Sequence, residues 1–118
     1  MKISDATKNM LKDTLLLLEV SEENFAEIAE GATNTDYFID SVLDDLQERG
    51  YVSFVRSSKQ VEKYLTMHKE EKRLFSIDVG GGAYFMGKVA PAAADKFVEK
   101  LREYFAASGD DEYKVNLI

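Results

Sequence analysis

The chain has 118 residues, carries a net charge of −7 and contains no cysteine. This length suits one ordinary domain, and the apolar fraction of 45% lies in the range of globular proteins. The lack of cysteine excludes disulfide bonds, thiolate zinc sites and cysteine nucleophiles. The longest apolar run is Leu15–Leu18, far short of the roughly 20 residues of a membrane-spanning helix, so we expect no membrane span and a cytoplasmic location.

Three helices are predicted in the first part of the chain. Ser4 is a suitable N-cap for a helix that ends near Leu18, and Ser21 is a suitable N-cap for a second helix, which we expect to stop at Gly31. The third helix has apolar residues at positions i, i+1, i+4, i+5 and i+8, which define one buried face, and Gly50 follows its end. The residues of that face are Phe38, Ile39, Val42, Leu43 and Leu46.

From residue 51 onward, strands and helices alternate. Aromatic and β-branched residues with a period of two predict four strands. Residues 58–68 carry apolar positions at i, i+3, i+4 and i+7, which favours a short helix, with an extended segment as the alternative. The glycine run at 80–82 predicts a hairpin turn, and Pro91 suits the first turn of the next helix. In order, the expected elements are a strand at 51–55, the short helix, strands at 74–79 and 83–89, a helix from Pro91 to near Gly109, and a strand at 113–117.

Together these elements predict an α+β fold. A helical segment with helix-turn-helix character, residues 1–50, precedes a βαββαβ half, residues 51–118, with the element order of ferredoxin-like domains. Periodicity and charge both change at Arg49–Gly50, but no flexible linker marks the boundary. We therefore expect the acidic helical segment and the α+β segment to share one core as one compact unit.

The charge is distributed unevenly along the chain. Residues 1–50 carry twelve acids and four bases, and no base occurs between Asp13 and Glu48. Such a surface repels phosphate backbones and anionic lipids, so we expect neither direct nucleic-acid binding nor membrane binding. It is either a hydrated helix face or a docking face for a basic partner. The candidate partner-binding residues are Glu27, Glu30, Asp36, Asp40, Asp44, Asp45 and Glu48.

Residues 11–55 resemble a winged helix-turn-helix. The likeness lies in a lead helix, the segment Ser21–Gly31, a turn at 33–36, and the segment Phe38–Val52, which closes with leucine, polar residues, glycine, tyrosine and valine. In that family the third helix enters the DNA major groove, so the resemblance implies a transcriptional regulator. Here this helix presents acidic residues and only Arg49 at its far end, whereas helices that bind in the groove carry Lys, Arg, Asn or Gln.

No residue set predicts a catalytic or metal site. His68 is the only histidine, at the end of the predicted short helix, where a capping or hydrated role is expected. The other roles of an active site are also unfilled, so we expect a protein that is not an enzyme and has no cofactor. A basic cluster runs from Arg56 to Arg73 and includes Lys69; it could bind anions or single-stranded nucleic acid, or pair with the acidic half within the chain or across a dimer.

The sequence therefore predicts a non-catalytic regulatory or adaptor protein. Its acidic helical face would bind a basic partner protein or a second copy of the chain, and one variant is an inhibitor whose acidic surface imitates DNA. Two alternatives are a winged-helix transcriptional regulator and a small-ligand sensor built on the βαββαβ half. The sensor requires an apolar pocket that contains a few polar groups.

Overall fold

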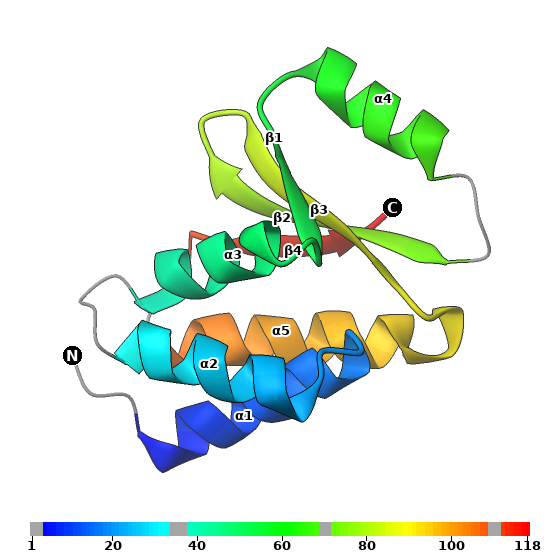
Figure 1. Ribbon diagram of the computed structural model, residues 1–118. Coiled ribbons are helices and arrows are strands. Elements are labelled where there is room, and N and C mark those ends of the chain that lie inside the picture. Colours follow the sequence, from blue (N-terminus) through cyan, green and yellow to red (C-terminus); the bar gives the residue numbers. More distant parts are fainter. Residues whose placement is uncertain (1–3, 34–37, 69–71, 109–111) are drawn as a thin grey trace.

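The computed structural model describes residues 4–33, 38–68, 72–108 and 112–118, and Figure 1 shows the arrangement of its elements. The helices are α1 (Asp5–Leu17), α2 (Glu22–Thr33), α3 (Phe38–Glu48), α4 (Ser58–Met67) and α5 (Ala94–Ala107), and a 3₁₀ turn spans Pro91–Ala93. The strands are β1 (Val52–Val55), β2 (Arg73–Gly80), β3 (Ala83–Val89) and β4 (Lys114–Leu117). The predicted α+β class and the βαββαβ order after residue 50 are confirmed.

The starts of three helices follow from capping serines, and before α2 the predicted cap Ser21 accepts through Oγ from the Asn24 N–H at 3.2 Å. Ser4 Oγ accepts a hydrogen bond from the Thr7 N–H at 3.2 Å, as expected for the N-cap of α1. Ser57 Oγ accepts from the Gln60 N–H at 3.2 Å in the same way, so residues 58–67 form the helix α4 and not the extended alternative.

Two expected boundaries are wrong. α2 does not stop at Gly31 but continues to Thr33, because the fully buried Ala32 extends the apolar face by another turn. That burial offsets most of the cost of glycine in a helix, about 1 kcal/mol. Pro91 begins a 3₁₀ turn, and α5 itself begins three residues later, at Ala94.

The ends of α1 and α3 share one hydrogen-bond motif. After α3, Gly50 donates its N–H to the Gln47 carbonyl at 3.0 Å with φ at 84°, and the next N–H donates back across the turn. After α1, Glu19 donates to the Leu16 carbonyl at 3.1 Å with φ at 67°. A side chain in this left-handed region costs on the order of 1 kcal/mol, so the end of α1 is strained where the end of α3 is not.

The four strands form one antiparallel sheet in the order β1-β3-β2-β4. A ferredoxin-like sheet places its last strand beside its first, whereas β4 lies beside β2, so the sheet departs from that arrangement at one edge. Helix α4 connects β1 to β2, and α5 connects β3 to β4; both connections move across the sheet in the same direction. However, β1 and β3 run in opposite directions, so two right-handed crossovers place their helices on opposite faces of the sheet. Figure 1 shows α4 and α5 on opposite faces.

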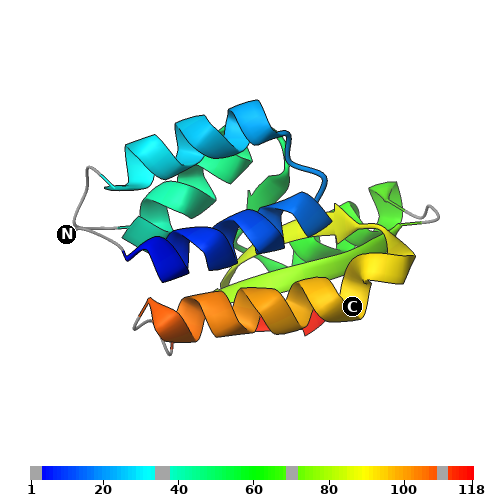
Figure 2. The same ribbon diagram turned by 90° about the horizontal axis from the view of Figure 1, so that it is seen from below.

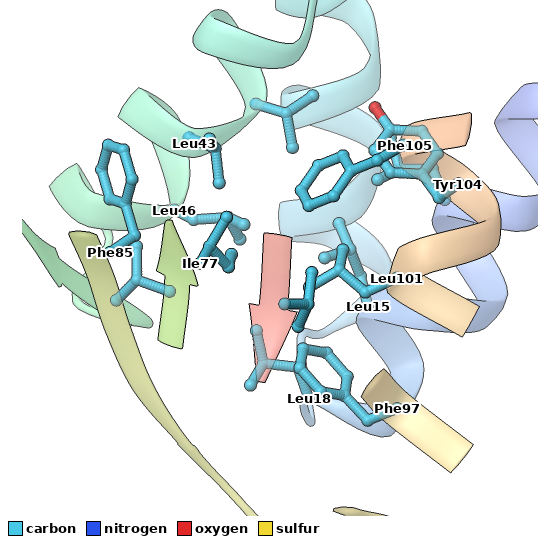
Figure 3. Close-up of a cluster of buried hydrophobic side chains, with 14 of the residues drawn as sticks. Leu15, Leu18, Leu43, Leu46, Ile77, Phe85, Phe97, Leu101, Tyr104 and Phe105 are labelled. Carbon is cyan, nitrogen blue, oxygen red and sulfur yellow. The ribbon is translucent and has the colours of Figure 1, made fainter. Parts of the chain in front are cut away.

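The core lies between one face of the sheet and the helices α1, α3 and α5. Phe75 of β2 packs against Phe97 of α5 with ring centroids 4.7 Å apart. Leu15 of α1 and Leu43 of α3 belong to the same cluster (Figure 3), and α1 and α5 lie side by side in Figure 2. The core thus contains side chains from both sides of Gly50, and the predicted apolar face of α3 is buried in it.

Phe75 requires a glycine opposite it in the sheet. It pairs in register with Gly87 of β3. A Cβ atom at Gly87 would lie 2.5 Å from the Phe75 ring, closer than two carbon atoms can approach. The aromatic ring therefore occupies the space that a side chain on β3 would need.

β4 is contacted along both of its long sides. Toward β2, the Ile118 N–H donates to the Leu74 carbonyl at 2.9 Å. In an antiparallel ladder the bonding direction alternates along the strand, so the Val115 carbonyl points away from β2. There it accepts two hydrogen bonds from Arg102 of α5, from Nε at 3.0 Å and from Nη2 at 2.6 Å.

Candidate functional site

The predicted partner-binding residues that the structure describes lie on α2 and α3, which pack side by side. A four-residue spacing places Asp40, Asp44 and Glu48 along one face of α3. All of the candidates that the structure describes are exposed except Asp45, which is half-buried, and Asp36 lies outside the described residues. We call the described members the acidic surface: Glu27, Glu30, Asp40, Asp44, Asp45 and Glu48.

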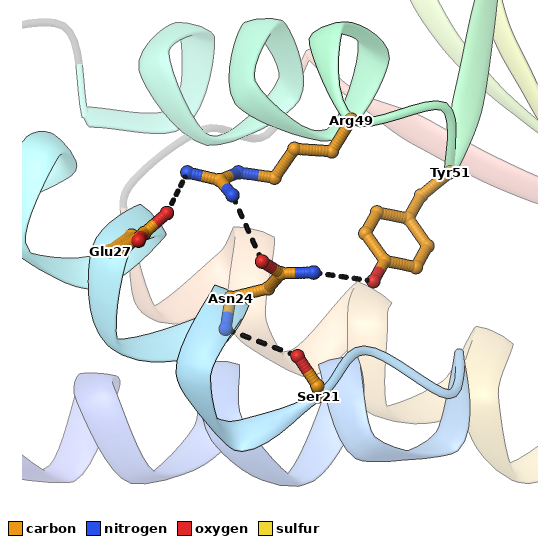
Figure 4. A network of polar contacts seen from close by, with 5 residues as sticks. All are labelled: Ser21, Asn24, Glu27, Arg49 and Tyr51. Atoms are coloured by element: carbon orange, nitrogen blue, oxygen red, sulfur yellow. Dashed lines mark hydrogen bonds and ion pairs between the residues drawn. The ribbon is translucent and has the colours of Figure 1, made fainter.

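A polar network fixes how α2 meets the end of α3 (Figure 4). Arg49 pairs with Glu27, with 2.6 Å between Nη2 and Oε2, and its Nη1 donates to Asn24 Oδ1 at 3.0 Å. Asn24 in turn donates through Nδ2 to the Tyr51 hydroxyl at 3.0 Å. The base that ends the acidic stretch therefore already has a carboxylate partner inside the molecule.

Two further acids of the first half have internal partners. The Tyr113 hydroxyl, just before β4, donates to Asp40 Oδ1 and so ties the start of α3 to the end of the chain. Lys72, just before β2, lies 3.3 Å from Glu19 at the end of α1. These contacts join the helical half to the sheet half, and they leave Asp40 less free for an outside partner than the sequence alone indicates.

The other carboxylates of α3 lie near its C-terminal end, where a negative charge is unfavourable. Asp44, Asp45 and Glu48 occupy its last two turns, where the helix dipole favours cations, and α3 has no base in its last turn. Across residues 4–33, 38–68, 72–108 and 112–118, no cation forms an ion pair with any of these three. Asp44 and Glu48 are four residues apart, a spacing at which like charges repel. This part of the acidic surface therefore destabilises the helix that carries it.

Comparison with known proteins assigns no family. No family model, curated protein or solved structure matches the chain. The winged-helix resemblance therefore rests on residues 11–55 alone. In the structure, the helix that would enter DNA presents the exposed carboxylates of Asp40, Asp44 and Glu48.

The histidine of the chain lies at the end of α4, beside Tyr64. His68 is the C-cap residue of α4, as the sequence predicts, and its ring packs on Tyr64 with centroids 4.4 Å apart. Burial raises the pKa of Tyr64 above its ordinary value of 10.0. Within the described ranges, no three acidic or histidine side chains come together in a way that could hold a metal ion. The helices described here are also too short or too polar to cross a bilayer.

A groove of about 710 Å³ opens between α4 and the outer face of the sheet, which is the face opposite α5. Its floor is Ser76 of β2 with Tyr84 and Met86 of β3, and Val61 and Leu65 of α4 form a wall. No residue of α4 is fully buried, so this helix covers the face only loosely. The periodicity of α4 indicated its apolar side, but nothing in the sequence indicated that the sheet beneath it is partly open.

Exposed cations also lie on α4, which forms the wall of this groove. Arg56 is among the lining residues, but its guanidinium carbon lies 5.1 Å from the centroid of the Phe54 ring, and Phe54 pairs with Phe85 on the core face of the sheet. Lys59 and Lys63 are exposed on α4, while Lys69 of the predicted basic cluster lies outside the described residues. Because α4 lies apart from α2 and α3 in Figure 1, these cations do not neutralise the acidic surface.

Proposed function

We propose that this chain is a non-catalytic regulatory or adaptor protein of the cytoplasm that binds a basic partner protein through its acidic surface. The observation that carries the proposal is that Asp44, Asp45 and Glu48, at the C-terminal end of α3, form no ion pair with any cation of the described structure. Residues that weaken a fold locally without compensation are typical of functional sites. A partner's lysine or arginine would interact favourably with both the carboxylates and the helix dipole.

The size of this local destabilisation makes it worth explaining. An acid in the last turn of a helix loses about 0.3–1 kcal/mol relative to a neutral or basic residue, and a like-charged pair at i, i+4 adds about 0.2–0.5 kcal/mol. Asp44 and Glu48 together therefore cost on the order of 1 kcal/mol at low salt. That is a noticeable part of the roughly 5–15 kcal/mol that separates folded from unfolded domains.

The acidic surface is also held rigidly, which favours binding. The face of α3 opposite its acids is buried in the core, through Val42, Leu43 and Leu46 among others. The contacts of Arg49 fix α2 against the end of α3. A surface that is already ordered loses little conformational freedom when a partner binds.

The experiment compares two charge-reversal variants that change the net charge equally. Asp44→Lys/Glu48→Lys alters the acidic surface, whereas Glu99→Lys/Glu103→Lys alters two exposed carboxylates at the same spacing on α5. The unmodified chain and both variants are immobilised and exposed to native extract at low and at high salt, because salt weakens charge-driven contacts. Each retained protein is identified, purified and titrated by calorimetry against all three chains.

A basic protein that binds the unmodified chain and the α5 variant, but not the α3 variant, supports the proposal. Equal binding to all three chains would show that the acidic surface is only a hydrated face. If duplex DNA displaces the retained protein, the acidic surface acts as the imitation of DNA. Retention of a second copy of the chain would identify the partner as a homodimer subunit, and retention of DNA itself would favour the winged-helix regulator.

A further inference from the structure

One face of α4 is directed into the groove between this helix and the sheet. The residues of α4 that line the groove are Ser58, Val61, Glu62 and Leu65, which have the i, i+3, i+4, i+7 spacing of a single helical face. Val61 and Leu65 are half-buried, as expected for a face that covers a sheet, whereas Glu62 is exposed. A carboxylate therefore lies among the apolar residues on the groove side of the helix.

Glu62 has no cationic partner in the part of the chain that the structure describes, because no ion pair found there includes it. No lysine of the described ranges lines the groove. Arg56 is a lining residue, but its guanidinium stacks on Phe54, on the core face of the sheet, and so is turned away from the groove. The carboxylate of Glu62 is therefore the charged group on the groove side of α4.

The rest of the groove is suited to an apolar body. Met86 on the floor is 1% exposed, and Val61 and Leu65 form the wall. Ile118 at the lip is 46% exposed, a large apolar side chain that nothing in the described structure covers. The volume of about 710 Å³ falls within the range of small-molecule sites.

We propose that this groove binds a small molecule with one ammonium group and an apolar chain or ring. The ammonium group donates to the carboxylate of Glu62, and the apolar body lies between α4 and the floor of the sheet. This site is independent of the acidic surface, because α4 lies apart from α2 and α3 in Figure 1. Either proposal can therefore fail while the other holds.

The charges around the groove favour a ligand with a single positive group. Glu62 is the only carboxylate among the described residues that line the groove, and it repels anionic ligands. Lys59 and Lys63 are exposed on the other sides of α4, and they repel a polycation such as a strongly basic protein. A small amine avoids both effects, because its one charge lies at Glu62 and the rest of the molecule is neutral.

α4 can adjust its position to ligands of different width. It has no fully buried residue, whereas α5 on the other face has six, including Phe97 and Tyr104. Elements with few buried contacts move at low free-energy cost. Ligand contacts would then supply the packing that α4 lacks, so binding stabilises α4 against unfolding.

The experiment crosses three ligands with two variants. Octylamine, octanol and octanoate share an apolar chain and carry a positive, a neutral and a negative head group at neutral pH. Glu62→Gln removes the carboxylate from the groove, and Glu99→Gln removes an exposed carboxylate from α5, so both variants change the net charge equally. Each ligand is titrated below its aggregation limit at low salt, and amide shifts in NMR spectra give both the affinity and the position of the bound chain.

We expect the unmodified chain to bind octylamine about fivefold more tightly than octanol, the effect of one partly exposed ion pair, and to bind octanoate most weakly. Glu62→Gln should abolish the preference for the amine and leave octanol binding unchanged, while Glu99→Gln should keep the preference. Equal affinity for octylamine and octanol, or an equal loss of the preference in both variants, would overturn the assignment of the ammonium group to Glu62.

The position of the apolar body is tested separately. In the unmodified chain, the amide shifts caused by all three ligands should cluster at Val61, Leu65 and Met86. Leu65→Asn places a polar group on the wall, and since Leu65 is only half-buried, thermal unfolding should show a folded protein that binds each ligand several-fold more weakly. Unchanged affinity, or shifts confined to other elements such as α3, would refute binding in this groove.

Discussion

Tyr104 has a buried hydroxyl without a partner, so its replacement by phenylalanine should stabilise the fold. The side chain lies in the core at 0% exposure, and its hydroxyl oxygen has no hydrogen-bond partner in the described structure. The nearby Ser108 hydroxyl donates to the backbone carbonyl of Tyr104 at 2.9 Å instead. The ring itself packs edge-on against Phe38 with centroids 5.8 Å apart, a contact that phenylalanine would retain.

The increase in the free energy of unfolding caused by Tyr104→Phe can be estimated from the environment of that hydroxyl. An unsatisfied polar group in the core costs about 1–3 kcal/mol. The void lined in part by Tyr104 has a volume of about 10 Å³, the lower limit for one water molecule, so water supplies no ready partner. Some dispersion contacts of the oxygen are lost on replacement, which leaves a net gain of about 1 kcal/mol, or a rise in Tm of about 4 °C for a chain of this length.

The difference in stability between Tyr104→Phe and the unmodified chain should increase at alkaline pH. Burial raises the pKa of Tyr104 far above its ordinary value of 10.0. Below about pH 10 the phenol is protonated in both states, so the stability of the folded state does not depend on this group. Above that pH the unfolded chain loses the proton while the folded chain keeps it, and the unmodified protein loses about 1.4 kcal/mol per pH unit that Tyr104→Phe does not lose.

Urea unfolding of both proteins from neutral pH to about pH 11 measures these effects, and the other tyrosines cancel because both proteins contain them. A Tyr104→Phe variant that is less stable at neutral pH would show that the hydroxyl has a partner and refute the reasoning. A difference that stays constant above pH 10 would show that Tyr104 ionises in the folded state.

Three further substitutions test the strained parts of the fold. Asp44→Lys/Glu48→Lys should raise the free energy of unfolding by about 1 kcal/mol at low salt and less at high salt, even as it abolishes partner binding; a fall in thermal stability would contradict the assignment of strain to these acids. Gly87→Ala should cost about 1–3 kcal/mol in urea unfolding, because the new methyl group meets the Phe75 ring, and a double-mutant cycle with Phe75→Leu should show a smaller penalty. Glu19→Gly should gain up to about 1 kcal/mol, since glycine adopts the left-handed φ without strain; a less stable variant would mean that the ion pair of this residue outweighs the strain.

The sequence predicted those parts of the fold that depend on local chemistry. Serine caps and apolar periodicity placed α1, α3 and α4 correctly, because these signals act within a few residues. The position of β4 beside β2 was not predictable in this way. The alternating pattern at Lys114–Leu117 is the same whichever edge of the sheet it joins, and long-range packing selects the edge.

In the candidate site too, features that depend on local spacing were predictable, and features that depend on long-range packing were not. The acids of α3 could be placed on one face from their spacing alone. Their internal partners could not, since Tyr113 lies 73 residues from Asp40 and Arg49 acts across two helices. The groove beneath α4 was also beyond prediction, because it exists only where Val61 and Leu65 stand over a sheet face whose strand order the sequence left open.

The contact between Arg102 and β4 limits how this sheet can add strands. An edge strand with free carbonyl and N–H groups is a template for another chain. At β4 the outward carbonyl of Val115 is already bound to a guanidinium, so an incoming strand would have to displace a charged group. The β1 edge carries no such cap in the described structure. If two copies paired through their sheets, they would do so at the β1 edge, and the assembly would end at two molecules instead of growing into a fibre.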